Sequence, residues 1–227
     1  MLGVNPHERA YVAPFLTFMA LLAAGEFVHA LFDGRAWWII AKPQYWVFPL
    51  QTAICGALLV RYWRYYDWRK PTKPLVAIGI GIAVFVIWIA PQELFQAAER
   101  RMGFDPAFFG GGWAWFSNIG VRCLRLVVVV PLLEEIFWRG FLLRYLVRDD
   151  FAKVQLGTFT PWSFGLVTLL FGCAHWGPDF GPAIITGALY NGVAYYTRSL
   201  SSCVLAHALT NLLLGAYIIK TGQWGFW

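Results

Sequence analysis

The sequence predicts an all-α fold, a polytopic transmembrane bundle of about seven to eight helices that forms a single membrane domain over residues 1–227. Composition is the first observation behind this prediction, because 59% of the residues are hydrophobic and 13% are charged. Soluble domains average about 45–50% apolar and about 25% charged residues. The second observation is that several apolar stretches approach the roughly 20 helical residues that cross about 30 Å of hydrocarbon.

The amino-terminal part, residues 1–100, is expected to hold three helices without any recognisable motif. The first stretch is long and lacks both a basic leader and a small-residue cleavage site, so we expect a retained helix and not a removed signal peptide. The three expected helices are 11–32, 45–62 and 74–94.

The carboxy-terminal part is expected to hold four more helices, two of them short. They are 121–146, 160–176, 182–196 and 202–219. The segment that precedes them, 101–118, is rich in glycine and aromatic residues and too polar to span a membrane. We expect it to lie along the interface or to dip into the protein.

Basic residues gather near the ends of the expected helices, as in the segment 61–73. Arg122 and Arg125 are counted with these flanking charges. Such charges set membrane topology and contact anionic lipid, and the aromatic residues among them suit the interface. The net charge of +6 therefore indicates a lipid bilayer and no nucleic acid as partner.

Two glutamates and an arginine lie inside the apolar stretch 121–146. Ionisable groups in a membrane helix are costly and usually face the protein interior at functional sites. Glu135 and Arg139 are four residues apart, so they meet on one face of a helix. Glu134 is turned about 100° away. We therefore expect Glu135 and Arg139 to pair and Glu134 to be free to act as a general base.

Three further places carry polar residues at helical spacing. His175 lies near the end of its apolar stretch, just before a Gly-Pro pair. His207 and Asn211 share one helix face at i and i+4, and Glu26 and His29 do so at i and i+3. Each of these can be a hydrogen-bonded packing group or part of a site, and we expect Glu26 and His29 to satisfy each other.

Hydrolysis of a peptide bond needs a base that activates water and donors that hold the oxyanion. A glutamate with a histidine supplies the first, and a histidine with an asparagine amide supplies the second. The set Glu134, His175 and His207 also suits zinc, which accepts carboxylate and imidazole ligands, although H-E-x-x-H spacing is absent. The residues alone leave both chemistries open.

Three spaced motifs occur in order on three separate apolar stretches. They are EEIFWR (134–139), which reads EExxxR, FGCAH (171–175), which reads FxxxH, and HALTN (207–211), which reads HxxxN. Together they resemble the CAAX protease and bacteriocin-processing (ABI) family of intramembrane proteases, in particular its type II CAAX prenyl endopeptidases. The resemblance covers residues 119–216. The short chain with its aromatic-rich amino-terminal half also resembles the exosortase-associated CAAX-protease-related group.

The resemblance implies a role for each motif residue. Glu134 and His175 would activate water. His207 and Asn211 would stabilise the oxyanion. Glu135 and Arg139 would be supporting residues, and members of the family are described both as metalloproteases and as metal-free glutamate enzymes. We therefore expect either no cofactor or a divalent metal such as zinc, held by Glu134, His175 and His207.

The leading hypothesis is an intramembrane endopeptidase that acts on a membrane-embedded or membrane-anchored peptide. We expect an integral, multi-pass protein of a bacterial inner (plasma) membrane. One alternative is a catalytically silent scaffold or immunity protein, in which the polar residues only hold helices together. Another is a proton-coupled transporter that uses Glu26, His29 and Glu134, although no two-half repeat is apparent.

The expected helices place His175 near one membrane face, whereas His207 enters from the other. At about 1.5 Å per residue, the two side chains would be about 15–20 Å apart. Their convergence requires the helix that carries His175 to end within the membrane, with Gly177 and Pro178 turning inside the protein. The sequence therefore predicts a helix break beside the site.

Overall fold

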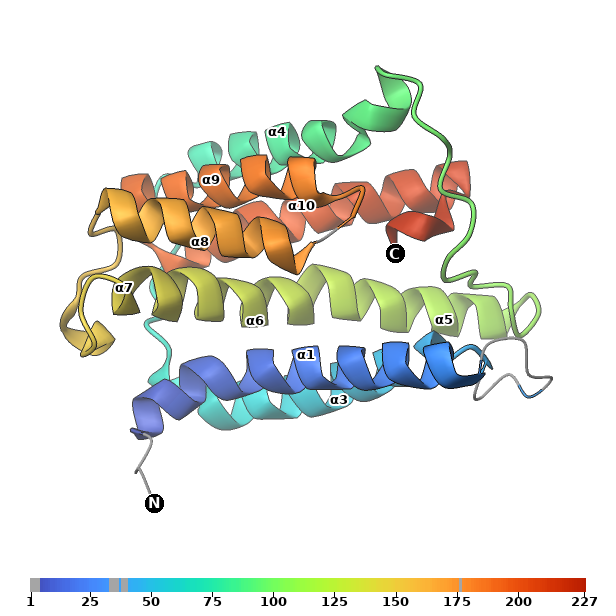
Figure 1. The fold of residues 1–227 in the computed structure, drawn as a ribbon, viewed down its shortest axis with the longest axis horizontal. Helices are drawn as coiled ribbons and strands as arrows, with labels where there is room; N and C mark the ends of the chain where they lie inside the picture. The colour runs from blue at the N-terminus through green and yellow to red at the C-terminus, as the bar shows by residue number, and fades with distance from the viewer. Residues whose placement is uncertain (1–4, 33–36, 38–40, 176) are drawn as a thin grey trace.

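A computed structural model describes the chain over residues 5–32, 37, 41–175 and 177–227. The regular structure in these residues is entirely helical and forms seven long helices, which confirms the predicted all-α bundle (Figure 1). One of them is continuous from α5 to α7, through two π-helical segments. The helices are α1 (Pro6–Phe32), α3 (Gln44–Tyr62), α4 (Pro74–Glu93), α5 (Trp113–Cys123) with α6 (Val130–Glu135) and α7 (Leu143–Tyr145), α8 (Pro161–Ala174), α9 (Phe180–Thr197) and α10 (Leu200–Thr221).

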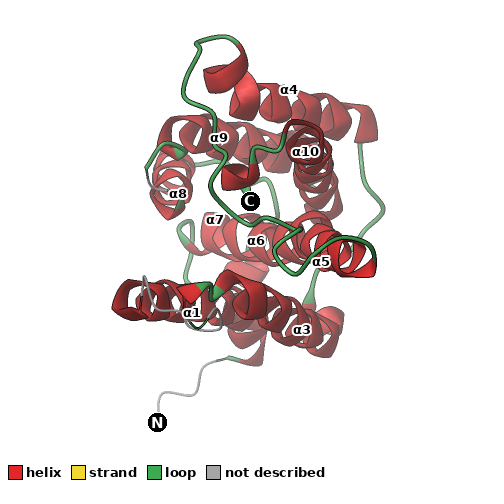
Figure 2. Cartoon of the chain, turned by 90° about the vertical axis from the view of Figure 1, so that its right-hand side faces the viewer, coloured by secondary structure: helices red, strands yellow, loops and turns green. Residues whose placement is uncertain are grey.

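The continuous helix from α5 to α7, here called the central helix, runs through the middle of the molecule (Figure 1). On one side of it, α1 and α3 pack against each other, and on the other side lie α4, α8, α9 and α10 (Figure 2). Within this second group, α4 packs on α10 and α8 packs on α9. Helices from both ends of the sequence therefore surround the motif-bearing central helix.

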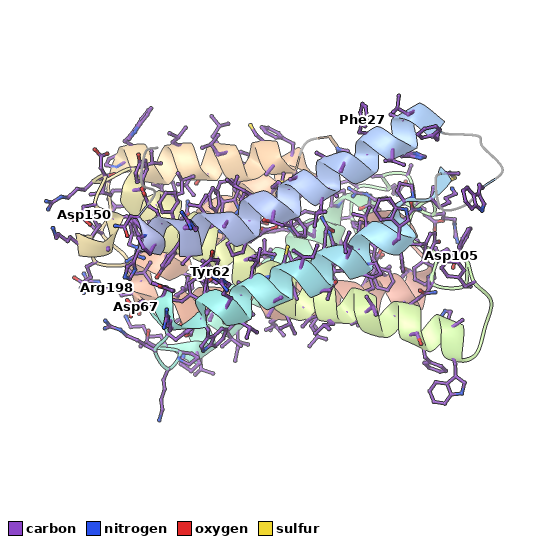
Figure 3. The ribbon with its side chains drawn as sticks, turned by 90° about the horizontal axis from the view of Figure 1, so that it is seen from below. Phe27, Tyr62, Asp67, Asp105, Asp150 and Arg198 are labelled. Atoms are coloured by element: carbon purple, nitrogen blue, oxygen red, sulfur yellow. The ribbon has the colours of Figure 1, made fainter. Side chains whose placement is uncertain are left out.

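Three helices, α1, α4 and α10, are long and apolar enough to cross a membrane. Large apolar side chains face outward along the bundle, such as Phe27, which is 65% exposed. Figure 3 shows Asp67, Asp150 and Arg198 toward one end of the bundle and Asp105 toward the other. Apolar flanks between polar ends suit a bilayer, so the chain is a membrane-associated helical bundle.

Six of the expected helices agree with the structure to within a few residues at each described boundary. The end of the stretch 160–176 falls on Trp176, which lies outside the described residues. The start of the stretch 121–146 is wrong, because the helix already begins at Trp113. The segment 101–118, expected to be an interfacial loop, is therefore helical in its last part.

Glycines explain this early start of the central helix. Gly110 and Gly112 have φ angles of 99° and 66°, which glycine adopts without the penalty of a side chain. The chain turns there and enters α5 directly after Gly112. The side-chain amide of Asn118 then donates to the carbonyl of Pro106 at 3.0 Å, which ties the loop to the new helix.

Candidate active site

Glu134 and Glu135 lie in α6, between two π-helical segments at Leu124–Val129 and Ile136–Leu142. In a π-helix the N–H group bonds the carbonyl five residues earlier, which adds about one residue relative to an α-helical turn, and such segments are frequent at functional sites. The two glutamates therefore occupy a short α-helical piece whose register is shifted on both sides.

Glu135 and Arg139 form the predicted ion pair, which the structure confirms. Arg139 Nη1 donates to Glu135 Oε1 at 3.1 Å, and both side chains are fully buried. Arg139 also donates to Asn191 Oδ1 at 3.1 Å and to the Gly187 carbonyl at 3.2 Å, both on α9. Buried guanidinium groups need such partners, so Arg139 holds the central helix to α9.

Glu135 has a second partner that helical spacing does not predict. Its Oε1 atom also accepts a hydrogen bond from His207 Nδ1 at 2.8 Å. A carboxylate only accepts, so Nδ1 carries the proton, and in the neutral ring Nε2 is left with its lone pair. Glu135 thus orients the His207 ring directly, in addition to pairing with Arg139.

Glu134 is buried, at 7% exposure, and does not pair with Arg139. Its Oε2 atom is buried without a hydrogen-bond partner among the described residues. Arg125 acts on this carboxylate through a Coulomb attraction. The glutamate therefore has a charged neighbour but keeps its oxygen atoms available, as the sequence predicts.

His175 lies at the end of α8, where the predicted helix break is confirmed. The helix ends at Ala174, Gly177 has a φ of 91° and α9 begins at Phe180. His175 Nδ1 lies 2.9 Å from the Phe171 carbonyl, an acceptor, so Nδ1 carries the proton and Nε2 is left free. The depth of this break in a bilayer stays a prediction.

Asn211 faces the first π-helical segment. Its Nδ2 donates to the Leu126 carbonyl at 2.7 Å. The Val130 N–H donates to the carbonyl of Arg125, five residues earlier. By the same π-helical spacing, the carbonyl of Leu126 would accept from residue 131, but this residue is Pro131, which has no N–H. The side chain of Asn211 therefore supplies the hydrogen-bond donor that Pro131 lacks. The second hydrogen of its amide nitrogen remains for another acceptor.

A single cavity brings the four predicted site residues together. It has a volume of about 360 Å³, and its lining includes Glu134, His175, His207 and Asn211. Of their helices, α10 packs against α6, and α8 packs against the following part of the central helix. His175 and His207, which the expected helices place near opposite membrane faces, therefore line one cavity.

The metal site that the sequence left open stays a prediction. Among the described residues, Glu134, His175 and His207 do not form a group of three side chains that could hold a metal ion. His207 already gives Nδ1 to Glu135, and His175 gives Nδ1 to a backbone carbonyl. These bonds leave Nε2 of both histidines available, as in metal-bound histidines whose other ring nitrogen donates to a carboxylate or a backbone carbonyl.

The expected pair of Glu26 and His29 is wrong. Glu26 lines the cavity, whereas His29 Nδ1 is buried without a hydrogen-bond partner in the described part of the chain. The spacing i and i+3 brings two side chains to one face of a helix, but it does not by itself make them bond to each other. The pair therefore does not satisfy itself.

Sequence reasoning also missed Arg122 and Arg125, which it counted as flanking charges. Both are buried and line the cavity. Their spacing of three residues inside an apolar stretch was the available signal, because two arginines on one helix face within such a stretch need partners or a function.

The fold and the site together define a helical membrane protein with a buried polar cavity of carboxylate, imidazole and amide groups. The Rce1-like family, described as type II CAAX prenyl endopeptidase Rce1-like, matches residues 116–213. This match confirms the resemblance seen in the three motifs. No curated protein and no solved structure matches the chain.

Proposed function

We propose that the protein is an intramembrane endopeptidase that hydrolyses a peptide bond of a membrane-associated substrate, with water activated by Glu134 and His175. The observation that carries this proposal is the partner-free carboxylate oxygen of Glu134 in the same cavity as His175, His207 and Asn211. A buried polar group without a partner costs free energy, and a bound water molecule would supply the missing donor.

Water activation uses two atoms without a partner among the described residues, Glu134 Oε2 and His175 Nε2. A water molecule donates one hydrogen bond to Glu134 and one to the Nε2 lone pair of His175. As the water oxygen bonds to the substrate carbonyl carbon, its proton passes to this acid–base pair. The same proton then moves to the leaving nitrogen when the C–N bond breaks, so that one carboxylic acid, which keeps the second water proton, and one amine are formed.

Stabilisation of the oxyanion uses His207 and Asn211. In its doubly protonated form, the His207 ring donates from Nε2 toward the cavity, while Glu135 holds Nδ1. Asn211 adds the amide hydrogen that it does not give to Leu126. Loss of one oxyanion donor typically costs about 10²–10³ in kcat, so each residue is expected to matter by this order.

The test compares the peptides of membranes that contain the wild-type chain, Glu134→Ala or His175→Ala. We expect either change to lower cleavage of a membrane reporter by at least about 10³-fold, because the base is lost. Glu99→Gln is the matched control, since Glu99 is an exposed acid outside the cavity, and it should retain full activity.

The two alternatives predict other outcomes for the same variants. A silent scaffold retains its full function in Glu134→Gln, with no cleaved peptide in any sample. A proton-coupled transporter gives pH-driven uptake into vesicles that Glu134→Gln abolishes. Cleavage that survives both Glu134→Ala and His175→Ala would contradict the proposed peptidase mechanism.

A further inference from the structure

Two arginines of the central helix line the cavity without belonging to the motifs EExxxR, FxxxH and HxxxN. Arg122 is 2% exposed and Arg125 is 5% exposed. Removing a guanidinium from water costs several kcal/mol unless charges or hydrogen bonds compensate, and inside an apolar helix such residues usually mark a function. The partners of the two arginines therefore decide what they do.

Arg125 is compensated within the protein. Its Nε atom donates to Gln51 Oε1 at 3.0 Å, and Glu134 attracts its charge. Gln51 is itself fully buried and is held by a bond from its Nε2 to the Phe18 carbonyl at 2.9 Å. Arg125 is thus fixed in place between α1, α3 and the central helix.

Arg122 is not compensated in this way. Its Nε and Nη1 atoms are buried without a hydrogen-bond partner, and no salt bridge in the described residues includes it. Its charged group lies 4.2 Å from the centre of the Phe48 ring and 5.4 Å from that of Phe104. Such contacts attract the cation to the face of each ring, but they do not satisfy the N–H donors.

We propose that Arg122, with Arg125 beside it, binds the carboxylate at the carboxyl terminus of a peptide substrate. The planar guanidinium presents paired N–H donors that match the two oxygens of a carboxylate. The aromatic walls exclude water around this end of the cavity and strengthen the charge-assisted bonds. The assignment rests on the proposed peptidase function and adds the part of the substrate that is recognised.

The experiment uses the full chain in lipid nanodiscs with a library of apolar fluorogenic octapeptides, each made as the free acid and as the carboxamide. For the wild type we expect the acid to exceed the amide in kcat/KM by at least about tenfold, mainly through KM, because only the acid offers a charged acceptor. In Arg122→Gln this ratio falls to about one. Arg122→Lys keeps the charge and should retain part of the preference.

A control and a binding measurement separate this proposal from the proposed function. Arg101→Gln removes an exposed arginine and should leave the preference for the acid unchanged. Glu134→Gln should cleave neither form, yet bind the acid at least about tenfold more tightly than the amide, as measured by isothermal titration calorimetry. If the acid binds more tightly than the amide and this difference depends on Arg122, but the wild type cleaves neither form, the carboxylate subsite is supported and the proposed peptidase function is refuted.

Three outcomes would overturn the assignment. The first is equal cleavage of acid and amide by the wild type together with equal binding by Glu134→Gln. The second is an acid preference that persists in folded Arg122→Gln. The third is that a lipid occupies the site. In this case native mass spectrometry detects an anionic lipid on the wild type but not on Arg122→Gln, and the wild type shows no preference for peptide acids over amides.

Discussion

Two adjacent glutamates at the centre of this protein have different environments. Glu135 Oε1 accepts bonds from both Arg139 and His207, although its Oε2 has no partner. Glu134 makes no hydrogen bond to a described residue and opens onto the cavity. One carboxylate therefore stabilises the packed core, while the other is kept ready for reaction at some cost in stability.

Neutralising these two carboxylates should have different consequences. Glu135→Gln leaves the buried Arg139 without its counter-charge, so we expect the free energy of unfolding to fall by about 3–5 kcal/mol. Glu134→Gln removes a buried carboxylate whose Oε2 atom has no hydrogen-bond partner among the described residues but which also attracts Arg125, so stability should change little while activity is lost. Unfolding followed by denaturant titration in mixed micelles, together with reporter cleavage, measures both. Equal destabilisation by the two changes would contradict this distinction.

The contact of Glu135 with Arg139 within one helix could be predicted from the sequence, whereas the expected pair of Glu26 and His29 was wrong and contacts between helices could not be predicted. The spacing of Glu135 and Arg139 fixes their pairing, because side chains four residues apart share a face. The bond from His207 to Glu135 joins residues that are 72 positions apart, so it depends on packing. Arg122 was misjudged for the same reason, since burial of its charge depends on rings supplied by other segments.

At the scale of the elements, the central helix is built around Pro131. The proline leaves the Leu126 carbonyl without its helical donor, and Asn211 from α10 takes that place. A local defect in one helix thereby becomes the anchor of a side chain from another. Neither π-helical segment was predicted, because the sequence of apolar residues there is compatible with an ordinary α-helix.

Replacement of the proline should separate stability from activity. Pro131→Ala supplies an N–H group that competes with Asn211 for the Leu126 carbonyl, so we expect kcat to fall by about tenfold as the amide loses its orientation. The helix gains a donor and loses the proline ring, so the unfolding midpoint should not decrease. Kinetics and unfolding of the same preparation measure the two effects. Unchanged kcat would show that the proline does not orient Asn211.

For the whole molecule, helices without any motif complete the site. The cavity wall includes Phe15, Phe18 and Glu26 of α1, together with Trp88 of α4. The number and approximate bounds of the helices could be predicted from composition and apolar length. Their arrangement around one cavity could not, because it depends on close approaches between helices that individual residue types permit.

One such approach joins α1 to the central helix at Gly140. A Cβ atom there would lie 2.9 Å from the ring of Tyr11, whereas one at Gly165 on α8 would meet nothing within 4 Å. We therefore expect Gly140→Ala to lower the free energy of unfolding by about 1–3 kcal/mol through overpacking. Gly165→Ala should be neutral or stabilising, since alanine favours the helix. Thermal unfolding of the two variants measures this difference. Equal stability of the two variants would show that Gly140 makes no close contact with Tyr11.

The two π-helical segments make the length of the central helix as important as its composition. Each accommodates an extra residue, and loss of that residue would turn everything beyond it by about 100°. A single deletion between Arg122 and Glu134 would thus move the arginines to another side of the helix axis, although every side chain of the site would still be present. Relatives of this chain should therefore tolerate exchanges of apolar residues in these segments far better than insertions or deletions.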